Sequence, residues 1–270
     1  MTVDEAELTT PDAGRRPGLE RCRWPALGEP YSAALRAAVA YILSRFRPVG
    51  IVASGTIIRG NPAPSSDLDL PVIVPEISPQ RVQRFFRGVP AEIFVNSPAT
   101  IWQGLERETR EDVPWMAHML ATGFVVYTAD AVVDELCAAA AATLAAGPRP
   151  PAAGELLRRR YFTAGYFQDA TDIADTDPEM CAAMLSAAVF DAMRYRFKAL
   201  GRWQPRAKDV LRALEEVDAA QAARVRAFYR TADLRERLRL AGEIVHRSVG
   251  ATGFFEWDSA SLAAQEGEHR

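Results

Sequence analysis

The chain has 270 residues, of which 49% are hydrophobic and 25% are charged, a balance typical of a globular protein with one large or two ordinary domains. A formal net charge of −3 argues against a general basic field, so we expect no DNA partner held by bulk electrostatics. No apolar run approaches the roughly 20 residues that cross a bilayer, and the three cysteines form no CxxC pair. These features predict a cytoplasmic protein without membrane contact or a disulfide framework.

Residues 1–28 carry proline, glycine and charge without periodicity, and this composition predicts a flexible N-terminal tail. The first half of the chain then alternates helical and extended patterns. Helices are expected at residues 29–46, 79–88, 100–107 and 112–123. Strands are expected at residues 49–54, 67–74, 90–98 and 123–130.

An alanine-rich helix is expected at residues 131–147. The Pro/Gly/Ala stretch "PRPPAAG" that follows should break a helix, so it is the predicted linker. We place a domain boundary there, between a first domain of residues 29–146 and a second of residues 147–270. The second domain is predicted to contain five helices, at residues 155–175, 178–200, 205–217, 219–230 and 232–249. The expected fold class is α+β, with a mixed sheet and helices followed by an all-α helical bundle.

Two aspartates alternate with leucines in "DLDLPVIV". In a strand, Asp67 and Asp69 share one face while the leucines share the other. Like charges this close repel one another and cost stability unless they are exposed or neutralised, and carboxylate oxygens suit Mg²⁺. Glu92, in the later strand "AEIFV", supplies a third carboxylate, so the pattern predicts a two-metal phosphoryl-transfer site. The alternative is a solvated strand edge without a metal, because short motifs often match by chance.

The residues Ser54, Gly55 and Thr56 end the preceding apolar run, eleven residues before Asp67. A glycine at this position lets the backbone approach a phosphate, and hydroxyls with free N–H groups at a following helix N-terminus would hold it. We therefore expect all three residues to bind phosphate beside the acids. Arg59, just past the glycine, is a further candidate for phosphate binding.

This arrangement of "SGT", then "DLDL" after ten residues, then an acid on a later strand resembles the nucleotidyltransferase superfamily of the DNA polymerase beta type. Within it, the chain is similar to the small-molecule branch that includes the aminoglycoside nucleotidyltransferases. The resemblance covers about residues 33–127, and the helical second half is similar to that branch in layout only. Its departures are Thr56 in place of the usual serine, and Pro71, which removes a ladder donor.

The resemblance implies roles for the motif residues. Gly55 and Thr56 would contact the triphosphate, and Asp67 and Asp69 would hold two Mg²⁺ ions. Glu92 would share the metal that activates the acceptor hydroxyl, with Glu106, Glu108 and Glu111 as alternatives for this third acid.

The second half offers further candidates. Asp169 and Asp172 lie three residues apart on a predicted helix, and the resemblance implies an acid of the helical domain as the catalytic base, which we assign to Asp169. Arg206 and Lys208 stand at a helix start, where acids are usual, and this favours binding of a β- or γ-phosphate. The alternative for each is an ordinary solvated helix face.

Together these features predict a Mg²⁺-dependent nucleotidyltransferase. It would transfer NMP, with AMP from ATP as the first choice, to a hydroxyl of a small molecule and release pyrophosphate. The acidic candidates favour an aminoglycoside-like polycation as acceptor. Two alternatives stay open: a protein acceptor, as in enzymes that modify toxin partners, and a nucleotide-binding module without turnover. The sequence predicts no oligomeric state.

Overall fold

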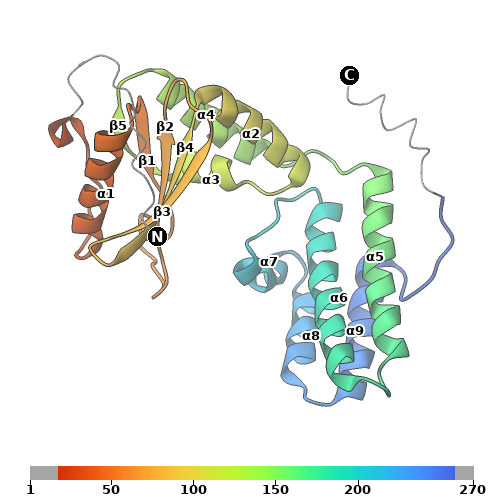
Figure 1. Cartoon of the computed structure of the whole chain (residues 1–270). Helices are drawn as coiled ribbons and strands as arrows, with labels where there is room; N and C mark the ends of the chain where they lie inside the picture. The colour runs from red at the N-terminus through yellow and green to blue at the C-terminus, as the bar shows by residue number, and fades with distance from the viewer. Residues whose placement is uncertain (1–17, 259–270) are drawn as a thin grey trace, which may run out of the picture. The chain divides into compact units, whose positions relative to one another are not determined.

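The structure, a computed structural model, describes residues 18–258, so residues 1–17 of the predicted tail lie outside the described residues. The described chain divides into two units. The first contains residues 18–105 and 116–142, and the second contains residues 106–115 and those from 143 onward. The first holds a five-stranded sheet and the second is helical, so the fold is α+β as predicted (Figure 1). The predicted boundary after residue 146 stays a prediction.

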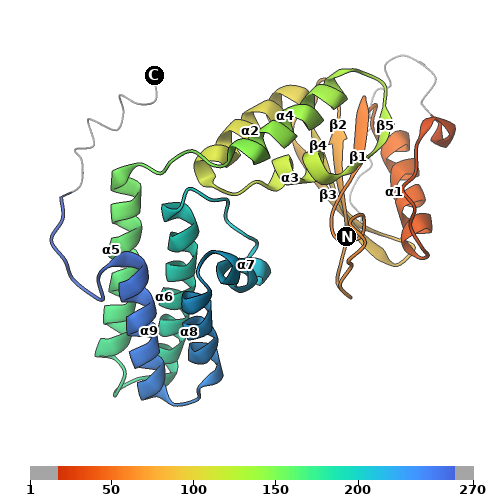
Figure 2. The same ribbon diagram turned by 180° about the vertical axis from the view of Figure 1, so that it is seen from behind.

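The sheet has the strand order β3-β4-β2-β1-β5. Strands β2 and β4 are parallel and the other neighbours are antiparallel, which makes it a mixed sheet. Helix α1 lies on one side of the sheet and α3 and α4 lie on the other, as Figures 1 and 2 show from opposite directions. Up to residue 146 the elements are η1 (Leu19–Arg21), α1 (Tyr31–Arg45), β1 (Gly50–Ala53), β2 (Leu68–Ile73), β3 (Gln80–Phe86), β4 (Val89–Asn96), α2 (Pro98–Glu111), α3 (Trp115–Thr122), β5 (Phe124–Thr128) and α4 (Val132–Ala146).

Burial along β4 alternates strictly with the two-residue period of a strand. Its buried residues join the core formed with α1: Val89, Ala91, Ile93 and Val95. The residues between them, which include Glu92, therefore face away from α1. The leucines flanking Asp69 are buried in the same core, so Asp69 also faces away from α1.

Pro71 stands inside a central strand, where a missing N–H group must be accommodated. Strands β1 and β2 pair at Ile51 with Val72 and again at Ser54 with Asp69. The ladder is interrupted between these pairs, opposite Pro71. The proline therefore interrupts the pairing of β2 with β1, while β2 continues and stays paired with β4 at Pro71 and Phe94.

The helix predicted at residues 79–88 is wrong, because this segment contains strand β3. Arg87 and Gly88 both have positive φ angles, 51° and 82°, and they form a two-residue turn between Phe86 and Val89, which pair with each other. Such a turn matches the twist of a hairpin. This edge strand is largely exposed on both faces, so its apolar residues do not alternate with polar ones as in a half-buried strand. Their spacing therefore resembles that of a helix.

Part of the predicted tail packs against the first unit. Within residues 18–28, Cys22, Trp24 and Leu27 lie against the core, and the Arg23 amide donates to the Val126 carbonyl, 2.8 Å away. These contacts cover the edge strand β5, so this part of the tail prediction is wrong. The composition gave no sign of this packing, because the three partly buried apolar residues are too few and too scattered to show periodicity.

The second unit contains α5 (Ala153–Asp172), α6 (Pro178–Ala199), η2 (Ala207–Asp209), α7 (Val210–Val217), α8 (Ala219–Arg230) and α9 (Leu234–Val249). The sequence places several of these boundaries directly. Asp177 caps α6, accepting from the Met180 amide at 3.0 Å, and Pro178 takes the first helical position. Gly250 ends α9 in the left-handed region, with φ of 74°. Among the described helices, none combines the length and apolar composition needed to span a membrane.

Candidate functional site

One face of the sheet carries a row of polar residues drawn from neighbouring strands. Asp69 of β2 pairs with Glu92 of β4, and Glu92 pairs with Gln83 of β3. On the other side, the Ser54 amide donates to the Asp69 carbonyl at 2.8 Å. Residues paired across neighbouring strands share a face, so all four side chains belong to the face that points away from α1.

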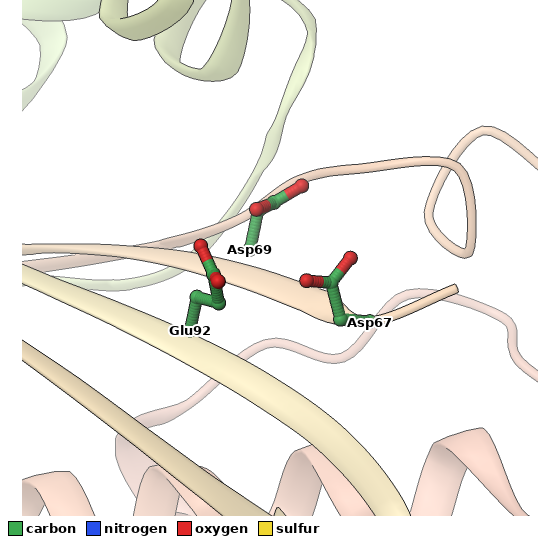
Figure 3. A group of neighbouring side chains, drawn as sticks. All are labelled: Asp67, Asp69 and Glu92. Atoms are coloured by element: carbon green, nitrogen blue, oxygen red, sulfur yellow. The ribbon is translucent and has the colours of Figure 1, made fainter. Parts of the chain in front are cut away.

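Three carboxylates meet in this row. Asp67 precedes β2 and Asp69 lies in it, on the same side of the strand, while Glu92 projects from the adjacent β4 (Figure 3). One oxygen from each carboxylate lies within 4.8 Å of the others, and all three side chains are half-buried. The structure therefore brings together the three acids that the sequence singled out.

The environment of Asp69 is unfavourable for a bare negative charge. Burial, followed by the charges of Asp67 and Glu92, raises the pKa of Asp69 to about 6. The cations Arg59 and Arg81 act in the opposite direction but do not cancel the shift. A bound cation would relieve the repulsion, and this is the electrostatic signature expected of a metal site.

Glu92 is held by two side chains of β3 that sequence analysis missed. Arg81 donates to one carboxylate oxygen and Gln83 to the other, and Arg81 also forms an ion pair with Glu92. Each carboxylate oxygen has two lone pairs, so each keeps one for a further ligand. Sequence analysis missed both residues because β3 was predicted as a helix. The dipeptide Arg87-Gly88 before an alternating strand was the signal that could have revealed the hairpin.

Gly55 allows the chain to pass close to the acids. Its φ angle is 91°, and a Cβ atom at this position would lie only 2.7 Å from Asp69 Oδ2. Any side chain would therefore both strain the backbone and push on the carboxylate. The Ser54 hydroxyl beside it is buried and has no hydrogen-bond partner among the described residues.

The helix expected after Gly55 is not formed. Residues 56–60 make a turn, in which the Arg59 amide donates to the Gly55 carbonyl at 3.2 Å, and Gly60 has a positive φ of 76°. Asn61 precedes Pro62, and a residue before proline disfavours the helical region. The Thr56 hydroxyl lies 2.7 Å from the Ser66 hydroxyl, so it closes this loop. Arg59 is exposed at the end of the turn.

The remaining candidates belong to the second unit. Asp169 is exposed on α5, as is Asp172. Arg206 is paired with Asp209 at 2.6 Å, and Lys208 is exposed within η2. The structure does not test whether these residues act with the acids of the first unit, so their roles stay predictions.

The donor set fits a hard divalent cation. All three groups are carboxylates, which Mg²⁺ and Mn²⁺ prefer, and their partial exposure leaves room for water or a phosphate oxygen to complete the coordination. Like charges converging beside a close-approaching glycine loop are costly without a cation, and that cost is visible in the raised pKa of Asp69.

Comparisons with known proteins add little to this geometry. No family model matches the chain, and no curated protein matches it. Among solved structures, the chain is similar to a nucleotidyltransferase-like protein from Exiguobacterium sibiricum 255-15, with 13% identity and a TM-score of 0.46 over 81% of this chain and 73% of that one. A likeness this low identifies neither a branch nor an activity, so the function is inferred from the acidic cluster itself.

Proposed function

We propose that the protein is a nucleotidyltransferase that uses a divalent metal, Mg²⁺ in the first instance, held by Asp67, Asp69 and Glu92. The observation that carries the proposal is the convergence of three carboxylates within 4.8 Å on two adjacent strands. When bound, the metal would neutralise charge on the phosphates and lower the pKa of an acceptor hydroxyl.

The residues of the chain would contribute positioning around this centre. Gly55 keeps the backbone close to Asp69, and a phosphate can approach the same surface because no side chain intervenes. The buried Ser54 hydroxyl has no hydrogen-bond partner within residues 18–258 and can donate to a phosphate oxygen. Arg81 and Gln83 fix the orientation of Glu92 through both of its oxygens. Arg59, exposed beyond the turn, supplies positive charge near the cluster.

The donor in this proposal is an NTP, with ATP as the first choice, and the acceptor is the hydroxyl of a small molecule. Pyrophosphate is the leaving group. The small net charge of −3 supports a small acceptor over a nucleic acid. Asp169 is proposed as the base, with Arg206 and Lys208 near the triphosphate, from the resemblance alone.

A nucleotide-binding module without turnover is the second candidate, and one observation favours it. Arg81 already pairs with Glu92, so part of the negative charge of the cluster is neutralised by the protein. If this pairing replaced the metal, nucleotides would bind without a requirement for Mg²⁺.

Thermal unfolding with ATP, GTP, CTP and UTP, each with and without Mg²⁺, distinguishes these candidates. A ligand at about 100 times its dissociation constant stabilises the native state by about 2.7 kcal/mol. We expect a stabilisation that requires both nucleotide and Mg²⁺ and that disappears in Asp67→Asn/Asp69→Asn. Glu76→Gln, an exposed acid of the same unit outside the cluster, serves as the matched control.

Turnover is then measured as pyrophosphate release from the stabilising nucleotide, with a panel of hydroxyl-bearing small molecules. Stabilisation without Mg²⁺ would favour the binding module. No stabilisation by any nucleotide at millimolar concentration would refute both candidates.

A further inference from the structure

The second unit contains a cavity of about 330 Å³ between α5 and α6. Four of its lining residues come from α5, at spacings of three and four that place them on one helix face, and the fifth comes from α6: Arg159, Phe162, Thr163, Tyr166 and Asp191. A cavity of this size lies in the range of small-molecule sites. Nothing in the proposed nucleotidyl transfer uses these residues.

The polar side chains of this cavity lie close together without side-chain hydrogen bonds between them. Asp191 and Arg159 are half-buried and line it, and the Arg159 guanidinium is near enough to lower the pKa of Asp191 although no hydrogen bond joins the two side chains. Thr163 is only 2% exposed, and it contributes a hydroxyl to the lining. A carboxylate, a guanidinium and a hydroxyl around one cavity offer both acceptors and donors to a polar ligand.

The aromatic side chains of the cavity are unusually open. Phe162 is 54% exposed and Tyr166 is 41% exposed, although the helix that carries them has a buried face available for large apolar residues. An aromatic ring beside a polar cavity offers its face to the C–H groups of a saturated ring or to another flat ring. A ligand with both a ring face and polar edges therefore matches this surface.

The charge around the cavity argues against a cationic ligand. Burial raises the pKa of Asp191, while the guanidinium groups of Arg194 and Arg159 lower it, so two cations face one carboxylate. A polyamine would be repelled by this excess of positive charge. A neutral ligand can instead donate hydroxyls to the Asp191 carboxylate and accept from Arg159 and Thr163.

We infer that the α5–α6 cavity binds a neutral saturated ring that carries adjacent hydroxyl groups, the chemistry shared by hexoses and cyclitols. Adjacent hydroxyls match the two oxygens of the carboxylate, and the apolar face of the ring matches Phe162 and Tyr166. That such a compound is also the acceptor rests on the proposed function, whereas the binding itself does not. The polycationic acceptor favoured by the sequence finds no support in this cavity.

The test is ligand binding to the full-length protein, measured by saturation-transfer NMR and titration without nucleotide or metal. The probes are myo-inositol for cyclitols, methyl β-D-glucopyranoside for hexoses, glucosamine as the cationic counterpart and adenosine as a flat aromatic ring. The variants are Asp191→Asn and Phe162→Ala. Their matched controls are Asp175→Asn, an exposed acid outside the cavity, and Phe254→Ala, an aromatic residue that is 84% exposed.

We expect saturation transfer to at least one neutral polyol. Asp191→Asn should lose about tenfold in affinity, the size of one hydrogen bond to a charged group. Phe162→Ala should lose about threefold to tenfold, because it removes an aromatic ring face. Both controls should bind as the wild type does, and circular dichroism should show the native helix content in all four variants. Asp69→Asn should also keep full binding, so loss of nucleotidyl transfer and loss of polyol binding are separable results.

Three results would overturn the inference. The first is that neither neutral polyol binds at about 50 mM, which is far above ordinary ligand dissociation constants. The second is equal polyol affinity in the cavity variants and the wild type, and the third is a clear preference for glucosamine or adenosine. A preference for glucosamine would mean that the charge argument is wrong, and one for adenosine would mean that the cavity selects a flat ring.

Discussion

Asp69 is the residue at which the chemistry of the cluster can be measured without knowing any substrate. Its folded pKa of about 6 lies above the ordinary value of 3.8 because burial and two neighbouring carboxylates disfavour the charged form. The folded state therefore holds this proton more tightly than the unfolded state. As the pH rises from about 4 through about 6, this difference is lost and the protein becomes less stable.

Asp69→Asn should remove this dependence, because the amide keeps the shape without the charge. We expect the variant to exceed wild type in free energy of unfolding at pH 7.5 by about 1 to 2 kcal/mol, after a discount for solvent screening of a half-buried group. At pH 4 the two proteins should be nearly equal. Urea unfolding in EDTA across this range measures the difference. If the difference in free energy of unfolding did not change with pH, the pKa of Asp69 would not be raised in the folded state.

The same residue links pH to metal binding, because only the carboxylate form is a ligand. Stabilisation of the wild type by Mg²⁺ should therefore decline as the pH falls through about 6, the folded pKa of Asp69. The destabilisation by the bare Asp69 carboxylate and the affinity for Mg²⁺ therefore both report the negative potential at the cluster.

Strand β3 is the element that sequence reasoning misassigned and that the site depends on. Most other elements followed from periodicity and caps, and the convergence of Asp67, Asp69 and Glu92 followed from strand alternation. The hydrogen bonds from Arg81 and Gln83 to Glu92 were not predicted, because exposure at the sheet edge removes the alternating pattern of β3. Only the turn at Arg87-Gly88 indicates the hairpin. The missing ladder donor of Pro71 was instead predictable from the sequence, and Asn61-Pro62 gives a local reason why a turn and not a helix follows Gly55.

Arg81→Gln tests what β3 contributes to the cluster. Arg81 lowers the pKa of Asp69 and pairs with Glu92, so its removal leaves the cluster more negative. At pH 8, where the acids are ionised, we expect Mn²⁺ to bind about threefold to tenfold more tightly, and the pH midpoint of binding to rise. Titration followed by the water-proton relaxation of Mn²⁺ measures both quantities.

Arg84→Gln is the matched control, since Arg84 lies on the opposite face of β3 with its guanidinium over Tyr41. It should leave Mn²⁺ binding unchanged. Weaker Mn²⁺ binding in Arg81→Gln would show instead that orienting Glu92 matters more than neutralising it.

At the scale of the whole molecule, the feature that sequence analysis did not predict is the grouping of residues 106–115 with the helices of the second unit. A buried charge cluster within that unit explains it. Lys198 of α6 pairs with Asp112 at 3.1 Å and with Glu155 at 2.6 Å, and the Gln204 amide donates to the Asp112 carbonyl at 2.7 Å. No local sequence pattern predicts the pairing of Lys198 with Asp112, which are 86 residues apart.

Lys198→Met should destabilise the protein strongly, because it leaves the buried Asp112 carboxylate without its cation. The side chains of Lys198 and Asp112 are 4% and 3% exposed, and Asp112 Oδ1 already lacks a partner in the described residues. Removing one partner of such a pair costs about 3 to 5 kcal/mol. Asp112→Asn/Lys198→Met should cost clearly less than the sum of the two single changes, because the uncompensated charge is gone.

Urea unfolding gives the four free energies of this cycle. Lys208→Met, which changes an exposed lysine, is the control that should match wild type. Additive single changes would mean that water screens the pair, and the cluster would then not account for the placement of residues 106–115.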